Sequence, residues 1–309
     1  MSELVEKMRQ QLAGYLAEHD KRQSKAAREM RVSTTTLSQF LSGTYPGDNE
    51  EVARKVKQFI TMDEAREDLS CSPGFCPTLR NTKEIITAAK LAHVAKDISL
   101  VYGPAGCSKS TTLRHYAETN SNVIYAEADA TTGSPRNSLF LVLEAMGETV
   151  GRASTAQMMR TIISKLADTN SLLIIDEAQH LTERAVDTLR AITDKARIGV
   201  VFSGNPSILR QMYGRQEEEF DQVHSRIGTF CELKNIYNTE EIQAYFDGYQ
   251  MEPCCIEYLR RIACQKGGLR LMDKHFRKAN TISKACGLEM SLPVLEKASA
   301  MMNVARRAL

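Results

Sequence analysis

The sequence predicts an α/β domain with a parallel sheet, set between two all-helical segments. Short, almost continuously apolar runs alternate with helical stretches in the middle of the chain, as expected for parallel strands that are buried on both faces. Before and after this region, apolar residues recur at helical spacing instead. The predicted strands are Ile98–Tyr102, Val123–Ala128, Leu172–Ile175, Gly199–Ser203 and Thr229–Leu233.

The composition is that of an ordinary globular protein. The chain has 309 residues, of which 42% are hydrophobic and 25% charged, and its formal net charge is +2. Because this charge is small, any nucleic-acid contact would depend on local basic patches. The eight cysteines do not form paired zinc-binding motifs, so we expect reduced thiols in a cytoplasmic protein. No apolar run is long enough to predict a membrane span.

Helix signals and linker composition predict the domain limits. In residues 1–62, Ser33 and Asp48 are placed to cap helices and Gly43 to end one. Residues 63–82 include the stretch SCSPGFCPT, which is typical of a linker because proline and glycine interrupt regular structure. We therefore expect a helical domain, this linker, an α/β domain over 83–234 and a helical C-terminal domain over 235–309.

A phosphate-binding loop follows the first predicted strand and opens a helix. The stretch GPAGCSKS, followed by Thr111, has the spacing and context of a Walker A motif, in which backbone N–H groups face the phosphates of ATP. Lys109 is predicted to reach the β- and γ-phosphates, and Ser110 to bind Mg²⁺. The predicted nucleotide-binding residues are Gly103, Pro104, Ala105, Gly106, Cys107, Ser108, Lys109, Ser110 and Thr111.

One position departs from the Walker A pattern, because Ser108 stands where the motif has glycine before the lysine. Glycine serves there because the backbone approaches phosphate closely and adopts unusual φ angles. A serine side chain at this position would narrow the phosphate-binding loop and weaken ATP binding or hydrolysis, so the sequence does not predict the rate of hydrolysis.

Two acids end the third predicted strand, in the sequence LLIIDEAQH. Burial of carboxylates at such a place is expensive unless they serve a purpose. Asp176 fits a magnesium-binding role, through water, and Glu177 fits a base that orients the attacking water. Solvated acids at a strand end would be the alternative if no phosphate-binding loop preceded them.

These motifs together resemble an AAA+ ATPase with a small helical lid. The resemblance implies that Asn205, after the fourth strand, positions the water, that Arg226 acts on a neighbouring subunit's site, and that Arg270 in the GGLR motif contacts the γ-phosphate. Each residue also has a plainer interpretation. Asn205 can cap the helix that starts at Pro206, and either arginine can form surface contacts.

The amino-terminal segment resembles a helix-turn-helix module. Ala26, Ala27, Met30, Val32, Leu37 and Leu41 are the predicted buried positions. A helix there would present hydroxyls and an amide to the major groove, beside cations that suit phosphates. The predicted DNA contacts are Lys25, Arg28, Thr34, Thr35, Thr36 and Gln39. A helical protein-interaction module remains the alternative.

Over nearly the whole chain the sequence is similar to the phage Mu transposition B family. The similar stretches are SGTYPGDNEEV, LLIIDEAQHL, ARIGVVFSGN and SRI. This resemblance implies an ATPase that binds ATP and Mg²⁺, forms a homo-oligomer or helical filament on double-stranded DNA, selects target DNA and activates a transposase. It places the protein in the host cytoplasm or nucleoid. It also makes Thr131, Thr132, Arg136 and Arg152 candidates for DNA contacts in the ATPase domain, although such residues are more often a solvated face.

Two other functions fit parts of the sequence. A helicase-loader or IstB-type helper would share the ATPase domain but bind a replicative helicase. A transcription regulator that senses ATP without hydrolysing it would explain Ser108 but not Glu177.

Overall fold

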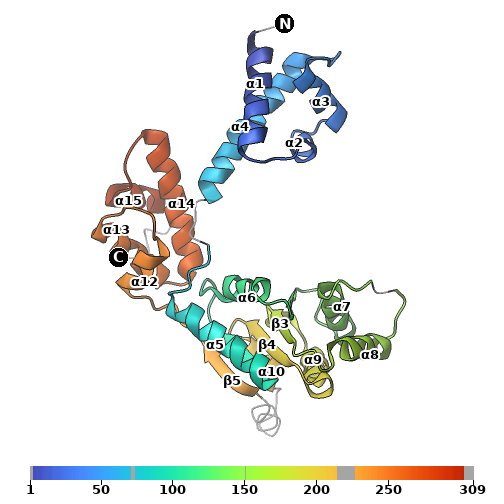
Figure 1. The fold of residues 1–309 in the computed structure, drawn as a ribbon. Helices are drawn as coiled ribbons and strands as arrows, with labels where there is room; N and C mark the ends of the chain where they lie inside the picture. The colour runs from blue at the N-terminus through green and yellow to red at the C-terminus, as the bar shows by residue number, and fades with distance from the viewer. Residues whose placement is uncertain (1–2, 71–73, 150, 214–226, 303–309) are drawn as a thin grey trace. The chain divides into compact units, whose positions relative to one another are not determined.

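Figure 1 shows the fold of the computed structural model, which describes residues 3–70, 74–149, 151–213 and 227–302. The chain divides into two compact units. Residues 1–72 and 280–287 form the first, and residues 73–279 and 288–309 form the second. Within the described ranges, no helix has both the length and the apolarity that crossing a membrane requires.

The amino-terminal unit begins with four helices whose ends follow the predicted signals. They are α1 (Glu3–Glu18), α2 (Gln23–Glu29), α3 (Thr34–Ser42) and α4 (Asn49–Ser70). Ser33 Oγ accepts a hydrogen bond from the Thr36 N–H at 2.9 Å, and Gly43 ends α3 with φ 76°. Asp48 Oδ1 accepts from the first turn of α4. These contacts confirm the predicted caps.

The core of this unit differs from the prediction at Val32 and Leu41, which were expected to be buried and are only partly buried. Phe40 is fully buried and Leu41 only partly, although Leu41 was the expected core residue. The Arg9 guanidinium lies 5.4 Å from the centre of the Phe40 ring and donates to the Phe40 carbonyl at 2.7 Å. The larger apolar side chain thus takes the core position and the aliphatic one lies at its edge.

Helix α4 also departs from the prediction, because it continues to Ser70, through residues expected to begin a linker. The sequence TMDEAREDLS contains strong helix formers and no proline or glycine until Pro73. Residues 63–70 therefore extend α4 instead of beginning the linker.

The second unit contains a five-stranded parallel sheet in the order β2-β3-β4-β1-β5. Its strands are β1 (Ile98–Tyr102), β2 (Val123–Glu127), β3 (Leu172–Asp176), β4 (Gly199–Gly204) and β5 (Ile227–Glu232). The predicted strands are confirmed within two residues at each end. Because all strands run in the same direction, the carboxyl ends of β1, β3 and β4 meet at one edge.

Helices cover both faces of the sheet (Figure 1). They are α5 (Arg80–Ala95), α6 (Lys109–Glu118), α7 (Pro135–Ala145), α8 (Thr155–Leu166), α9 (Glu183–Ala196) and α10 (Ile208–Tyr213), with a short 3-10 turn at Ala178–His180. Alternate residues of each strand enter opposite cores, as the period of two requires. Val101 and Ile174 pack with α5 and α6, whereas Leu100 and Ile175 pack with α7, α8 and α9.

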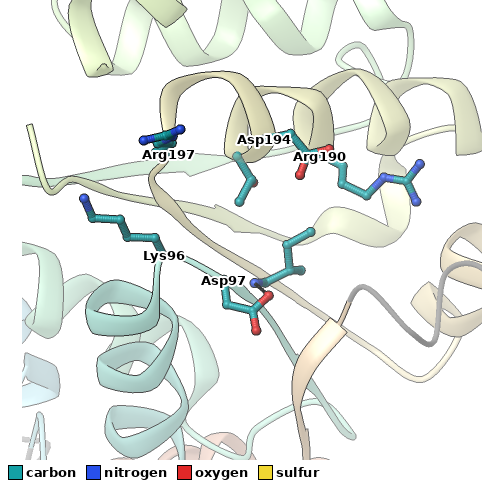
Figure 2. Close-up of a pocket in the computed structure, with 7 residues that line it drawn as sticks. Lys96, Asp97, Arg190, Asp194 and Arg197 are labelled. Atoms are coloured by element: carbon teal, nitrogen blue, oxygen red, sulfur yellow. Dashed lines mark hydrogen bonds between the residues drawn. The ribbon is translucent and has the colours of Figure 1, made fainter. Parts of the chain in front are cut away.

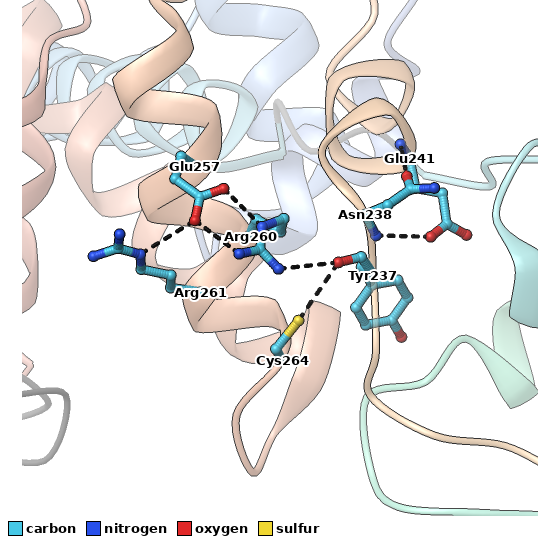
Figure 3. A network of polar contacts seen from close by, with 7 residues as sticks. All are labelled: Tyr237, Asn238, Glu241, Glu257, Arg260, Arg261 and Cys264. Atoms are coloured by element: carbon cyan, nitrogen blue, oxygen red, sulfur yellow. Dashed lines mark hydrogen bonds and ion pairs between the residues drawn. The ribbon is translucent and has the colours of Figure 1, made fainter.

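The carboxyl-terminal helices are α12 (Thr239–Tyr245), α13 (Pro253–Ala263), α14 (Gly268–Cys286) and α15 (Leu292–Met301). Figure 3 shows polar contacts that join α13 to Tyr237, in the segment before α12. Arg260 forms an ion pair with Glu257 at 2.7 Å and donates to the Tyr237 carbonyl at 3.3 Å. Asn238 and Glu241 form a capping box at the start of α12. These contacts fix α13 against the segment that leads into α12.

Candidate functional site

The phosphate-binding loop lies between β1 and α6, at the carboxyl edge of the sheet. Gly103 packs so closely on Leu233 that a Cβ there would lie 2.7 Å from the Leu233 carbonyl oxygen. Lys109 is buried, and its Nζ donates to the carbonyls of Gly103 and Pro104 at 2.8 and 2.9 Å. The loop therefore holds its lysine inside the ring of backbone that Walker A motifs place around phosphates.

Ser108 adopts the left-handed conformation, with φ 69° and ψ 11°. It is the N-cap of α6, but its side chain makes no capping hydrogen bond. This is the backbone region in which glycine has no steric penalty. The structure thus supplies the physical reason for glycine in the motif: the position requires a left-handed residue, and this protein meets the requirement with serine.

Cys107, also in the loop, is 1% exposed. Burial raises the pKa of its thiol, opposed by the nearby Lys109. The protonated Sγ donates to the Pro104 carbonyl at 3.0 Å. Its side chain therefore packs beneath the loop as a small apolar group.

Asp176 ends β3 and is fully buried. Its Oδ2 accepts a hydrogen bond from the Tyr125 hydroxyl at 2.8 Å, and its Oδ1 accepts from the Glu177 N–H at 3.0 Å. Burial and then the Asp176 carboxylate raise the pKa of Tyr125 far above its ordinary value, so the phenol remains a donor. Arg114 lies over the Tyr125 ring at 5.3 Å and pairs with Glu127 at 3.0 Å.

The residues suited to Mg²⁺ are Ser110, in the first turn of α6, and Asp176. Both offer hard oxygen ligands, the type that Mg²⁺ prefers. Asp176 is held by two hydrogen bonds that fix its carboxylate at the sheet edge beside the phosphate-binding loop. This donor set fits a magnesium ion bound jointly with nucleotide phosphates.

Glu177 and Asn205 lie at the ends of neighbouring strands. The Asn205 side chain accepts from the Ser207 N–H at 2.8 Å and from its hydroxyl at 2.5 Å. These bonds stabilise the turn before α10, which begins at Ile208 and not at Pro206 as predicted. Gln179 donates to Glu177 Oε2 and accepts from the Asn205 N–H. Tyr125 and Gln179 were not among the predicted site residues. The only sequence signal for either was that Gln179 is a polar residue two positions after the acidic pair, in LLIIDEAQH.

The GGLR segment of the helical region contacts the phosphate-binding loop through backbone. The Leu269 N–H donates to the Gly106 carbonyl at 2.9 Å. Gly106 has φ 84°, and a Cβ on it would lie 2.0 Å from the Gly267 carbonyl oxygen and 3.3 Å from the Arg270 nitrogen. Arg270 is exposed at the first turn of α14. The structure thus brings this predicted residue beside the loop, whereas Arg226 lies outside the described residues.

The predicted DNA contacts differ in how exposed they are. Lys25, Arg28, Thr34 and Thr35 are exposed on α2 and α3, and Thr36 and Gln39 are half-buried. In the second unit, Asp129 Oδ1 accepts from both the N–H and the hydroxyl of Thr131, and Thr132 Oγ1 donates to the Asp129 carbonyl. Arg136 donates to the Ala153 carbonyl at 2.8 Å, and Arg152 is exposed. The hydroxyls of Thr131 and Thr132 therefore form hydrogen bonds within the turn after β2.

A separate pocket of about 340 Å³ lies at the other end of β1 (Figure 2). Lys96, Arg190 and Arg197 line it together with Asp97 and Asp194. Lys96 and Arg197 are the residues that end α5 and α9, where cations complement the helix dipole. The positive charge at Lys96 and Arg197 is explained by these helix ends, and the pocket lies at the opposite end of β1 from the phosphate-binding loop.

Comparison with known proteins agrees with this geometry. Residues 92–212 match the family of AAA domains, and residues 225–302 match the carboxyl-terminal family of Mu B transposition proteins. The chain is 28% identical over 274 residues to the ATP-dependent target DNA activator B of Escherichia phage Mu, covering 88% of this chain and 87% of that protein. The chain is a relative of the Mu B transposition proteins. It is also 25% identical to the Mu-like prophage FluMu DNA transposition protein B of Haemophilus influenzae, covering 90% and 96%.

Solved structures share the AAA+ fold at low identity. Cdc6p of Pyrobaculum aerophilum superposes with a TM-score of 0.57 and 13% identity, covering 74% of this chain and 69% of that one. A RuvB variant of Thermotoga maritima gives a TM-score of 0.51 and 15% identity, covering 76% and 72%. The second unit therefore contains the AAA+ fold, in agreement with the AAA-domain match over residues 92–212.

Proposed function

We propose that this protein is an ATPase that binds duplex DNA when it carries ATP, and that it activates a DNA transposase on that target. The observation that carries the proposal is the similarity to a target DNA activator over 88% of the chain, in a protein whose Walker residues lie at one sheet edge. The ATP dependence, the target DNA and the role in transposition are taken from the names of the similar proteins.

In this proposal each site residue has a defined task. Lys109 binds the β- and γ-phosphates, and Glu177 orients the attacking water. Ser110 and Asp176 hold Mg²⁺, which when bound neutralises phosphate charge. The remaining assignments are Asn205 and Arg270 at the γ-phosphate and Arg226 at the site of the neighbouring subunit.

ATP would act by favouring assembly. If Arg226 contacts the nucleotide of the neighbouring subunit, the ATP-bound protein forms more contacts as a homo-oligomer or filament than as a monomer. ATP then shifts the population toward the assembled state. Hydrolysis would then release subunits from DNA. The exposed Lys25, Arg28, Thr34 and Thr35 are proposed to grip DNA through phosphates and base edges.

DNA retention tests the proposal most directly. The full-length protein is applied to immobilised duplex with ATP, with ADP or without nucleotide, and we expect retention only with ATP. Lys109→Ala should abolish the difference, whereas Lys90→Ala, which removes an exposed cation from α5, should leave it intact. Equal retention in all three conditions would refute the proposal.

Phosphate release separates hydrolysis from sensing. We expect the wild-type protein to release phosphate faster with duplex DNA present, and Glu177→Gln to lower the rate about 100-fold or more, the usual contribution of a general base. A wild-type protein that binds ATP but releases no phosphate would instead be an ATP sensor.

A further inference from the structure

Gln179 links the acidic end of β3 to the end of β4 through both ends of its carboxamide. Its Nε2 donates to Glu177 Oε2, and its Oε1 accepts a hydrogen bond from the Asn205 N–H at 3.1 Å. One side chain therefore contacts the carboxylate proposed as the base and the backbone of the residue proposed as the sensor.

The neighbouring backbone is shaped to admit this side chain. Gly204, the last residue of β4, has no Cβ, and a Cβ built there would lie 2.4 Å from Gln179 Oε1. Glu177 is left-handed, with φ 52°, and directly precedes the 3-10 turn that carries Gln179. Gly204 thus leaves space at the end of β4, and the left-handed Glu177 turns the chain after β3, so that the Gln179 carboxamide lies between the two strand ends.

The Asn205 side chain does not supply the same link. Its Oδ1 accepts hydrogen bonds from Ser207, so the recorded connection between Glu177 and this strand end runs through Gln179. The three rotatable bonds of a glutamate side chain allow several rotamers, and a donor held at a fixed place selects among them. Orientation of this kind is a large part of catalysis.

We infer that Gln179 is a positioning residue, which fixes the Glu177 carboxylate and ties its place to the end of β4. The inference rests on the proposed role of Glu177 in ATP hydrolysis. Gln179 acts through Glu177, and its loss should lower turnover without weakening nucleotide binding.

Gln179→Met tests this, because methionine has a similar length and lacks both hydrogen bonds. We expect the kcat for ATP hydrolysis to fall roughly tenfold to a hundredfold, while KM and the Kd of a fluorescent ATP analogue change less than about twofold. Gly204→Ala should produce the same split, because its methyl group displaces the Gln179 carboxamide. Thermal unfolding of both variants shows whether they are folded.

A double-mutant cycle distinguishes positioning from a general structural effect. In a Glu177→Ala background, Gln179→Met should change the single-turnover rate less than about twofold, because no carboxylate remains to be held. Equal losses in both backgrounds, or a folded Gln179→Met variant with wild-type kcat, would overturn the inference and leave the proposed function standing. Absence of hydrolysis in the wild type would instead refute the proposed function and, with it, the role of Gln179.

Discussion

Replacing Ser108 with glycine should stabilise the protein. Ser108 sits at φ 69° and ψ 11°, where an L-residue costs about 1–2 kcal/mol because its Cβ approaches the following carbonyl. Glycine removes that cost but makes the unfolded chain more flexible, which opposes folding by about 0.4–1 kcal/mol. The difference leaves a net gain of about 1 kcal/mol in the free energy of unfolding.

The hydrogen bonds of Ser108 are not altered by the substitution. The Ser108 side chain makes no capping hydrogen bond, so its removal loses no such contact. Its carbonyl still accepts from the Thr112 N–H at 2.9 Å, a backbone contact that glycine retains. The substitution therefore isolates the conformational strain of one residue.

Urea unfolding of the full-length protein, followed by a probe of the second unit, is the measurement. Ser108→Ala is the matched control: it keeps the Cβ and its strain while removing the hydroxyl, and should lie within about 0.5 kcal/mol of the wild type. If Ser108→Ala stabilised the protein as much as Ser108→Gly, or if Ser108→Gly destabilised it, the left-handed strain would not be the controlling effect.

Three further substitutions test other parts of the fold. Phe40→Ala should destabilise the amino-terminal unit by about 3–5 kcal/mol, measured by denaturant unfolding, without changing ATP affinity. Tyr125→Phe leaves the buried Asp176 with one donor fewer and should lower the free energy of unfolding by about 1–3 kcal/mol; an unchanged value would show that the hydroxyl contributes little. Burial lowers the pKa of His275 below its usual 6.5, so unfolded chains bind the proton first and stability should fall as pH drops below about 6.5. His275→Gln should flatten that part of a stability-versus-pH curve.

The strands were predictable because burial on both faces leaves a direct trace in the sequence. Val101 and Ile174 on one face and Leu100 and Ile175 on the other are all fully buried, so these runs cannot alternate with polar residues. The Walker residues were predictable for a related reason, since each needs a particular residue type at a fixed distance from a strand end.

The partners of those residues were not predictable, because they depend on register between distant segments. In the parallel pairing of β2 with β3, Tyr125 lies opposite Ile174 and Glu127 opposite Asp176. Tyr125 and Asp176 therefore occupy the same face of the sheet, which allows the hydrogen bond between them. Nothing in the local sequence around Tyr125 distinguishes it from an ordinary strand aromatic.

The contact between the lid and the phosphate-binding loop has a consequence for Arg270. Because the Leu269 N–H donates to the Gly106 carbonyl, the residue before Arg270 is bonded to the loop itself. Gly106 and Gly268 permit this approach, since a Cβ on Gly268 would lie 2.6 Å from the Gly106 carbonyl oxygen. We expect a nucleotide that shifts the loop backbone either to shift the start of α14 with it or to break this hydrogen bond. We therefore expect this backbone contact to couple the position of Arg270 to phosphates bound in the loop.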